Sequence, residues 1–269
     1  MTKGAYLVDL NGKVCIVTGA SSGIGRRTAQ DLARRGAVVC AVARREDLLV
    51  ELVESLSGGD HSFFAADVSD PTRVRALARH VEEIHGRCDV LINNAGFSAG
   101  GAFRGTDSLE DLHRVIDTNL FGAIHCSAEL LPLLVRAAPS HIVNVTSVAG
   151  RLSIPGASAY CASKFALVGW TESARYDLES KGVYLSSVEP GPIPTEGFPQ
   201  SGLVGHPLLR MALGSPGDVS RAIIGSIEHR KPQRVVPRPY YLLQFVRLLA
   251  PRLYRSLTRR ILAGRSLDQ

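Results

Sequence analysis

The chain has 269 residues, of which 45% are hydrophobic and 21% charged, and its formal net charge is +6. This size and composition are typical of a globular protein with one α/β domain or two small ones. Ten Lys and Arg residues, and no Asp or Glu, lie between His229 and Leu267. Because the rest of the chain is therefore acidic on balance, we expect no nucleic-acid-binding surface.

The cysteine spacing and the apolar runs indicate the cellular compartment that the protein is suited to. The five cysteines, at positions 15, 40, 88, 126 and 161, form no CxxC or other metal-ligand spacing. This favours a reduced, intracellular protein with no metal site. The first ten residues contain no apolar core of signal-peptide length, and no run reaches the ~18 apolar residues that span a bilayer. We expect a cytoplasmic protein, unless another feature attaches it to a membrane.

Short apolar runs alternate with helical stretches along most of the chain. The predicted strands are Val14–Val17, Ala37–Val42, His61–Ala65, Val90–Ile92, Ile142–Val145 and Val183–Val188. The predicted helices are Ile24–Arg35, Asp47–Leu56, Thr72–His85, a long helix within Leu109–Ala137 that Pro132 is expected to kink or interrupt, and Ser158–Ser180. Wholly apolar strands between helices predict an α/β fold with a doubly wound, Rossmann-type parallel sheet. Residues 1–236 would form this single domain, with its ligand at the carboxyl ends of the strands.

A glycine-rich turn, TGASSGIG at residues 18–25, follows the first predicted strand. Its glycines allow close approach of the backbone to a pyrophosphate, and the next helix offers free N–H groups and a partial positive charge. The spacing is GxxxGxG, which differs from the general GxGxxG dinucleotide pattern. The predicted phosphate-binding residues are Gly19, Ser21, Ser22, Gly23, Ile24 and Gly25.

The residues at the end of the second predicted strand indicate which dinucleotide would bind. An acidic residue there would bind a ribose 2′-hydroxyl, whereas arginine accommodates a 2′-phosphate. The strand ends in Ala43 followed by Arg44 and Arg45, which favours NADP(H) over NAD(H). The alternative is a pair of solvated arginines at a helix N-terminus, where the helix dipole disfavours them.

Tyr160 and Lys164 lie four residues apart on a predicted helix and therefore share one face. A nearby ammonium is expected to lower the pKa of a tyrosine and make it an acid/base catalyst. Ser147 follows the predicted strand Ile142–Val145, and Asn119 lies inside the long helix. Taken singly, each of these residues also has an ordinary structural explanation.

The motifs of the chain taken together are more specific than any one of these residues. TGASSGIG, Asp67-Val68, Asn93-Asn94-Ala95-Gly96, Asn119, Ser147, Tyr160-Cys161-Ala162-Ser163-Lys164 and Pro190-Gly191 occur in this order. From about Asn11 to Val236 the chain resembles the short-chain dehydrogenase/reductase family in its single-domain form.

The resemblance implies a role for each matching position. Tyr160 would be the general acid or base, and Lys164 would lower its pKa and bind the nicotinamide ribose. Ser147 would hold the substrate oxygen, and Asn119 would anchor a water in the proton relay. Asp67 would bind the adenine, with Val68 beside it. The remaining implied cofactor contacts are Asn94, Ala95, Gly96, Pro190, Gly191, Ile193 and Thr195.

Two further segments bear on the substrate and on partners. The apolar residues of 196–217 suggest a substrate lid, and Gly150–Gly156 would form another wall, which favours a lipophilic substrate such as a steroid, retinoid or fatty-acyl carbonyl. Residues 237–269 read as a basic amphipathic helix with Leu253, Leu257 and Ile261 on one stripe. That helix either packs on its own domain or on a sister subunit, or it attaches the protein to anionic lipid.

We therefore expect an NADP(H)-dependent alcohol dehydrogenase or carbonyl reductase, without a metal. A binding protein that senses NADP(H) without turnover, and a redox-neutral dehydratase or epimerase, are the alternatives. By the resemblance, the long helices within 109–137 and 158–180 would pair in a homodimer or homotetramer.

Overall fold

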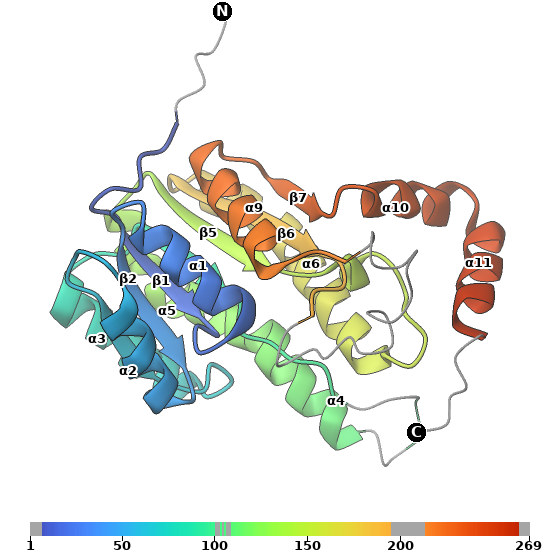
Figure 1. Ribbon diagram of the computed structural model, residues 1–269, viewed down its shortest axis with the longest axis horizontal. Helices are drawn as coiled ribbons and strands as arrows, with labels where there is room; N and C mark the ends of the chain where they lie inside the picture. The colour runs from blue at the N-terminus through green and yellow to red at the C-terminus, as the bar shows by residue number, and fades with distance from the viewer. Residues whose placement is uncertain (1–6, 100–102, 104, 106–108, 195–212, 264–269) are drawn as a thin grey trace, which may run out of the picture.

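The computed structural model describes residues 7–99, 103, 105, 109–194 and 213–263, and the side chains through residue 259. A parallel sheet with the strand order β3-β2-β1-β4-β5-β6-β7 lies at its centre (Figure 1). The order reverses between β1 and β4, which places the predicted ligand crevice at the ends of these two strands. The strands are β1 Val14–Thr18, β2 Val38–Ala43, β3 Ser62–Ala65, β4 Val90–Asn93, β5 Ser140–Val145, β6 Val183–Pro190 and β7 Gln233–Val236.

Helices cover both faces of the sheet, which confirms the predicted doubly wound fold. Successive strand side chains point to opposite faces, so Cys15 and Val17 join one hydrophobic core while Val14 and Ile16 join the other. The first core also contains α1 Gly23–Ala33, α2 Glu46–Ser55 and α9 Pro216–Glu228. The second contains α3 Pro71–His85, α5 Gly122–Arg136 and α6 Ser158–Glu179.

The helix α9 was not predicted, although its start carries a clear signal. The hydroxyl of Ser215 accepts from the backbone N–H of Asp218, and the Asp218 carboxylate accepts from the Ser215 backbone, which forms a capping box. Pro216 occupies the first helical turn. Residues 216 and 217 of the predicted lid belong to the first turn of α9, and residues 196–212 lie outside the described residues.

The long predicted helix is interrupted, but not at its proline. Residues Leu109–Ile116 form α4, a π-helical turn η2 follows at Asp117–Phe121, and α5 continues through Pro132 to Arg136. A π turn of this kind often lies at a functional site, and this one contains Asn119. By length and composition alone, Leu109–Arg136 could cross a membrane, but α5 packs against β4 and β5 of the sheet.

The C-terminal extension forms two helices instead of the single one expected. These are α10 Tyr240–Leu249 and α11 Pro251–Ala263, which lie together at one end of the molecule (Figure 1). Proline disfavours helical geometry at the preceding residue, and Ala250 accordingly adopts φ −136° and ψ 64° between the two helices. All five cysteines are buried and unpaired.

Hydrogen bonds of Thr18 join the end of β1 to the end of β4 and to the turn that follows it. The Thr18 hydroxyl accepts from the N–H groups of Asn94 (2.9 Å) and Ala95 (3.0 Å) and donates to the carbonyl of Ile92 (3.3 Å). These bonds satisfy buried groups at the point where β4 ends, so the turn after β4 keeps a fixed position relative to β1.

Thr18→Val preserves the side-chain shape but leaves the N–H groups of Asn94 and Ala95 without their acceptor. We expect the free energy of unfolding to fall by about 2–4 kcal/mol, because each buried unpaired donor is costly. Urea unfolding measures this. Thr28→Val is the control: its hydroxyl donates within α1 to the carbonyl of Ile24 (2.8 Å), and its loss should cost only about 1 kcal/mol. Equal losses in both variants would contradict the role of Thr18.

Candidate active site

The glycine-rich turn leaves no room for side chains. A Cβ on Gly19 would lie 2.8 Å from Nδ2 of Asn94, and one on Gly25 would lie 2.2 Å from the carbonyl oxygen of Gly19. The Asn94 amide also donates to the carbonyls of Thr18 (2.9 Å) and Gly19 (3.3 Å). Ser22 precedes α1 without a side-chain cap, and no acidic residue occupies the first turn of that helix. The N-terminus of α1 therefore suits an anion such as a pyrophosphate.

The two arginines after β2 contact other predicted cofactor residues. Arg45 Nη2 donates to the hydroxyl of Ser21 in the glycine-rich turn (3.2 Å). Arg44 Nη1 lies 3.7 Å from a carboxylate oxygen of Asp67, which follows β3, and both side chains are exposed. The structure thus brings the predicted phosphate-binding and adenine-binding positions together at neighbouring strand ends.

The turn after β4 packs closely on the helices behind it. A Cβ on Gly96 would lie 2.9 Å from Oδ1 of Asn119, and one on Gly122 would lie 2.6 Å from a methyl group of Val68. Ala95 packs against the second hydrophobic core. The cofactor contacts that the resemblance implies for Val68, Ala95 and Gly96 remain predictions.

The side chain of Asn119 is engaged by its own domain. It donates to the carbonyl of Phe97 (2.9 Å) and the hydroxyl of Ser163 (3.0 Å), and it accepts from the N–H of Phe97 (2.9 Å). These bonds tie the turn after β4 to α6, which carries Tyr160 and Lys164. Asn119 thus positions the catalytic helix, and its role in a water relay remains a prediction.

The structure gathers Ser147, Tyr160 and Lys164 at the carboxyl end of β5. The Ser147 hydroxyl donates to the carbonyl of Pro190 (3.3 Å) and shares a hydrogen bond with Tyr160. Lys164 Nζ donates to the carbonyl of Val145 (3.0 Å) and lies 5.8 Å from the centre of the Tyr160 ring. Three of the four predicted catalytic side chains therefore form one cluster, with Asn119 behind it.

Burial dominates the acid–base chemistry of this cluster. It raises the pKa of Tyr160 to about 12 against the smaller lowering effect of the hydrogen bond with Ser147. It also lowers the pKa of Lys164 to about 8. The net shift is therefore opposite to the lowering that was expected from the ammonium, because the cost of desolvating the phenolate is larger. Tyr160 keeps its proton at neutral pH, which suits a general acid.

The segment after β6 is fixed on two sides. The N–H of Gly191 donates to the carbonyl of Val236 (2.7 Å), and a Cβ on Gly191 would lie 2.8 Å from the ring of Tyr240. Ile193 is buried in the first hydrophobic core. The predicted contact Thr195 lies outside the described residues.

Two groups of buried polar residues behind the site were missed. Asn93 Nδ2 donates to Oδ1 of Asn144 (2.9 Å), and Asn144 Nδ2 donates to the hydroxyl of Thr171 (2.8 Å), which links β4, β5 and α6. Glu189 is fully buried and accepts from Arg151 (2.8 Å), Gln233 (2.8 Å) and Gln244 (2.9 Å). The available signal was an amide or carboxylate side chain within or at the end of a strand of the central sheet.

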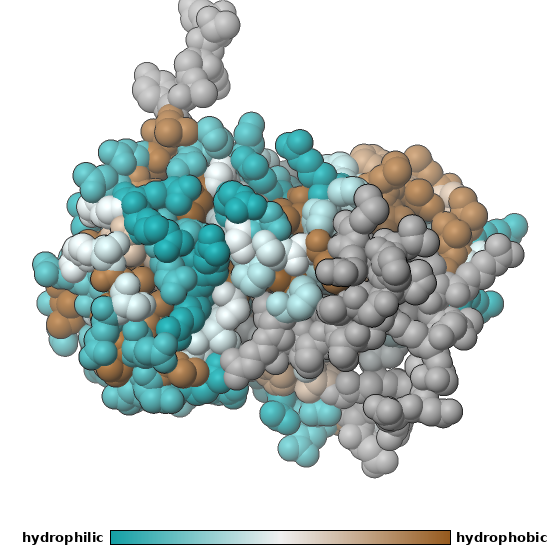
Figure 2. Space-filling view, in the orientation of Figure 1, coloured by the Kyte–Doolittle hydropathy of each residue, from teal (hydrophilic) through white to brown (hydrophobic). Residues whose placement is uncertain are grey.

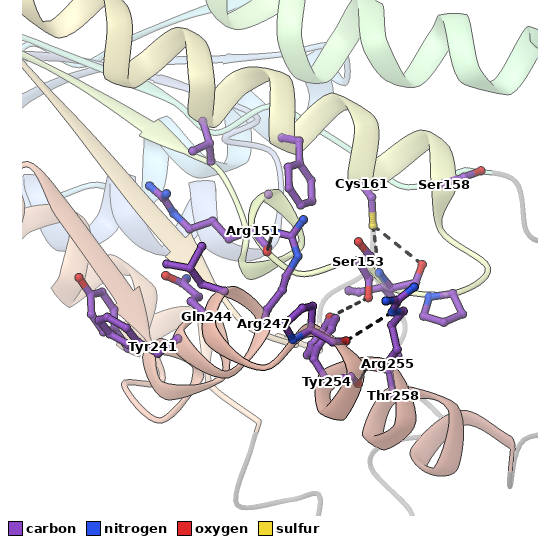
Figure 3. A pocket seen from close by; sticks show the side chains of 18 of the residues that line it. Arg151, Ser153, Ser158, Cys161, Tyr241, Gln244, Arg247, Tyr254, Arg255 and Thr258 are labelled. Carbon is purple, nitrogen blue, oxygen red and sulfur yellow. Dashed lines mark hydrogen bonds between the residues drawn. The ribbon is translucent and has the colours of Figure 1, made fainter.

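A groove of about 1340 Å³ lies between the predicted wall Gly150–Gly156, the first turns of α6, and α10 with α11 (Figure 3). Arg151, Cys161, Tyr254 and Arg255 are among the side chains around it. Its lining does not include Ser147 or Tyr160, so it lies beside the catalytic cluster rather than at it.

Comparisons with known proteins agree with this arrangement. The family model of the short chain dehydrogenases matches residues 13–202. The ketoacyl reductase HetN of Nostoc sp. is 32% identical, over 86% of this chain and 80% of that protein. A 3beta-hydroxysteroid dehydrogenase of Mediterraneibacter gnavus is 39% identical over 71% of this chain and 70% of that protein. A farnesol dehydrogenase of Aedes aegypti is 37% identical over 79% and 89%, respectively.

Two solved structures share the fold. A short-chain dehydrogenase/reductase from Burkholderia phymatum in complex with NAD has a TM-score of 0.80 and 29% identity, covering 92% of this chain and 96% of its own. The RhlG/NADP active-site complex of Pseudomonas aeruginosa has a TM-score of 0.79 and 27% identity, covering 89% of this chain and 100% of its own.

Burial of Lys164 makes stability depend on pH. An unfolded chain holds the lysine proton up to a pKa of 10.5, whereas the folded chain releases it near pH 8. Between these values the unfolded state binds more protons, so this residue adds stability as the pH rises.

Lys164→Met removes the titrating group and therefore this pH dependence. Between about pH 7 and pH 9.5, we expect the free energy of unfolding of wild type to rise by about 2 kcal/mol relative to that of the variant. Urea unfolding at a series of pH values measures this. Lys181→Met, on an exposed residue after α6, is the control and should show no such change. Parallel stability curves for wild type and Lys164→Met would contradict the burial of an ammonium.

Proposed function

This chain belongs to the short-chain dehydrogenase/reductase family and is an oxidoreductase of that type, and we propose that it transfers a hydride between NADP(H) and the carbonyl or secondary alcohol of a lipophilic substrate. The observation that carries this proposal is the cluster of Ser147, Tyr160 and Lys164 beside a glycine-rich turn that has no space for side chains. A sensor without turnover would need the turn but not the cluster.

The residues at the crevice fit a phosphorylated dinucleotide. The turn formed by Gly19 and Gly25 and the uncapped start of α1 suit the pyrophosphate. NAD and NADP complexes both occur among the similar structures, so the choice between them rests on Arg44 and Arg45. Two guanidiniums beside Ser21 and Asp67 favour a 2′-phosphate, because arginine forms charge-assisted and often bidentate bonds with phosphate.

The bound nicotinamide would supply or accept the hydride. During reduction, Tyr160 Oη gives its proton to the carbonyl oxygen as that oxygen gains negative charge; during oxidation it accepts the proton of the alcohol. The Ser147 hydroxyl, already hydrogen-bonded to Tyr160, donates to the same oxygen and holds it in place. The Lys164 ammonium stabilises the phenolate that Tyr160 leaves after proton transfer.

Apolar surroundings support a lipophilic substrate. Ile154 of the predicted wall is 40% exposed and lines the neighbouring groove, whereas Leu152 is buried in a core cluster. Two of the relatives are named for a hydroxysteroid and for farnesol, both of which are lipophilic alcohols. The apolar residues of the predicted lid up to residue 212 lie outside the described residues.

The same proposal includes a homodimer or homotetramer. Leu109, Phe121 and Val135 along the α4–α5 segment are 43%, 44% and 39% exposed. Apolar side chains of this size on one long helical segment support its pairing with a second copy.

Replacing both arginines by alanine, Arg44→Ala/Arg45→Ala, tests the cofactor preference. We expect the Kd for NADPH to rise tenfold or more, since a charge-assisted hydrogen bond contributes about 1.5–3 kcal/mol, while the Kd for NADH changes by less than about twofold. Isothermal titration measures both. Arg79→Ala, on an exposed arginine of α3, is the control. An equal loss for both cofactors would refute the assignment of a 2′-phosphate site.

Tyr160→Phe removes the proton donor while preserving the ring. We expect kcat to fall by about 10²–10⁴-fold with farnesol or a 3β-hydroxysteroid as substrate, with NADPH binding nearly unchanged. Tyr184→Phe is the control, because its hydroxyl accepts from Arg230 away from the site. Undiminished turnover in Tyr160→Phe would exclude this mechanism, and a product formed without net cofactor oxidation or reduction would point to a redox-neutral reaction.

A further inference from the structure

The outward side of α10 and α11 carries a patch of exposed leucines. Leu242, Leu249 and Leu253 are 69%, 79% and 53% exposed, and we call them the leucine patch. Figure 2 shows hydrophobic residues gathered over α10 at this end of the molecule. A cluster of large exposed apolar side chains generally marks an interaction site.

The leucine patch is not an unfinished part of the domain core, because the opposite side of the helices is already packed. Gln244 donates to the buried carboxylate of Glu189 (2.9 Å), and the guanidinium of Arg247 donates to the carbonyl of Arg151. The Tyr254 hydroxyl donates to the carbonyl of Ser153 (3.0 Å). These contacts fix α10 and α11 on the domain.

These contacts bear on whether the predicted basic helix packs on its own domain or binds a partner. Tyr254 of that helix packs on the domain, whereas Leu253 and Leu257 of its apolar stripe remain 53% and 38% exposed. Packing on its own domain therefore accounts for one side of the extension only, and the other side needs a partner.

Exposed arginines lie on and next to α10 and α11, and Arg255 and Arg259 among them also line the groove. Arg238, Arg252, Arg255 and Arg259 are exposed, and none of them forms an ion pair with any carboxylate in the described part of the chain. No acidic residue occurs from His229 to Leu267. The partner must therefore offer an apolar phase together with negative charge.

We propose that α10 and α11 dock on an anionic lipid surface, with the leucine patch in the acyl boundary and the arginines at the headgroups. Exposed leucines flanked by arginines are the combination that binds such an interface. A second copy of the chain fits less well, because a two-fold interface at this patch would oppose the arginines of one copy to those of the other.

Docking would place the groove beside α10 and α11 next to the lipid. Ile154 and Phe165 of the wall and of α6 line this groove together with Leu248 of α10. This consequence suits the lipophilic substrate of the proposed function, but the docking itself does not depend on any reaction.

The test is co-sedimentation of the full chain with vesicles of phosphatidylcholine alone or of phosphatidylcholine mixed with phosphatidylglycerol. Leu242→Ser/Leu249→Ser reduces the apolar contact, and Arg252→Glu/Arg255→Glu reverses the charge. Leu7→Ser/Ile84→Ser and Arg79→Glu/Lys181→Glu are matched controls on exposed residues elsewhere. Circular dichroism melting and NADPH binding check that every variant is folded.

We expect wild type and both controls to pellet with the anionic vesicles and each patch variant to bind at least tenfold more weakly. Wild-type binding should also fall at ~1 M NaCl, where the Debye length is about 3 Å. Equal recovery of wild type and both patch variants would overturn the proposal, as would equal binding to phosphatidylcholine alone. Absence of pelleting, with a dimer that Leu242→Ser/Leu249→Ser dissociates in analytical ultracentrifugation, would instead assign the patch to a subunit interface.

Discussion

The hydrogen bonds of Thr18 and Asn94 across the ends of β1 and β4 are the contact on which the rest of the site depends. Thr18 accepts from two N–H groups of the turn after β4, and Asn94 donates back to the turn after β1. The backbone approach is so close that Gly19 and Gly25 cannot carry a Cβ. Hydrogen bonds therefore fix the two turns at the reversal of strand order, and the glycines leave the backbone between them accessible. A pyrophosphate needs such close access to the backbone.

Buried polar groups then connect this crevice to the catalytic cluster. Asn119 ties the turn after β4 to α6, and Asn93 and Asn144 link β4 and β5 to the same helix. Each of these side chains would be costly to bury alone, but together their donors are satisfied. The result is that α6 presents Tyr160 and Lys164 to Ser147 in one geometry, which the transfer of a proton to a substrate oxygen demands.

Glu189 extends the same connection to the C-terminal helices. It directly precedes the segment that the family resemblance assigns to the nicotinamide, and its carboxylate accepts hydrogen bonds from Arg151, Gln233 and Gln244. Through Gln244, α10 is fixed to the strand that ends at the site. The buried carboxylate of Glu189 therefore lies between α10 and the strand end that carries the candidate site.

The sequence by itself determined the family and the doubly wound sheet and supplied the candidate catalytic residues, because apolar periodicity and motifs can be read along the chain. Six strands and most helices followed from this periodicity, whereas β7 was not predicted, and Tyr160, Lys164 and Ser147 were singled out by their match to the family motifs. Only the tertiary structure decided the π turn at Asn119, the direction of the Tyr160 pKa and which face of α10 and α11 packs on the domain. Each depends on what surrounds a residue: burial that outweighs a neighbouring charge, bonds to a distant helix, and one packed and one open face of α10 and α11.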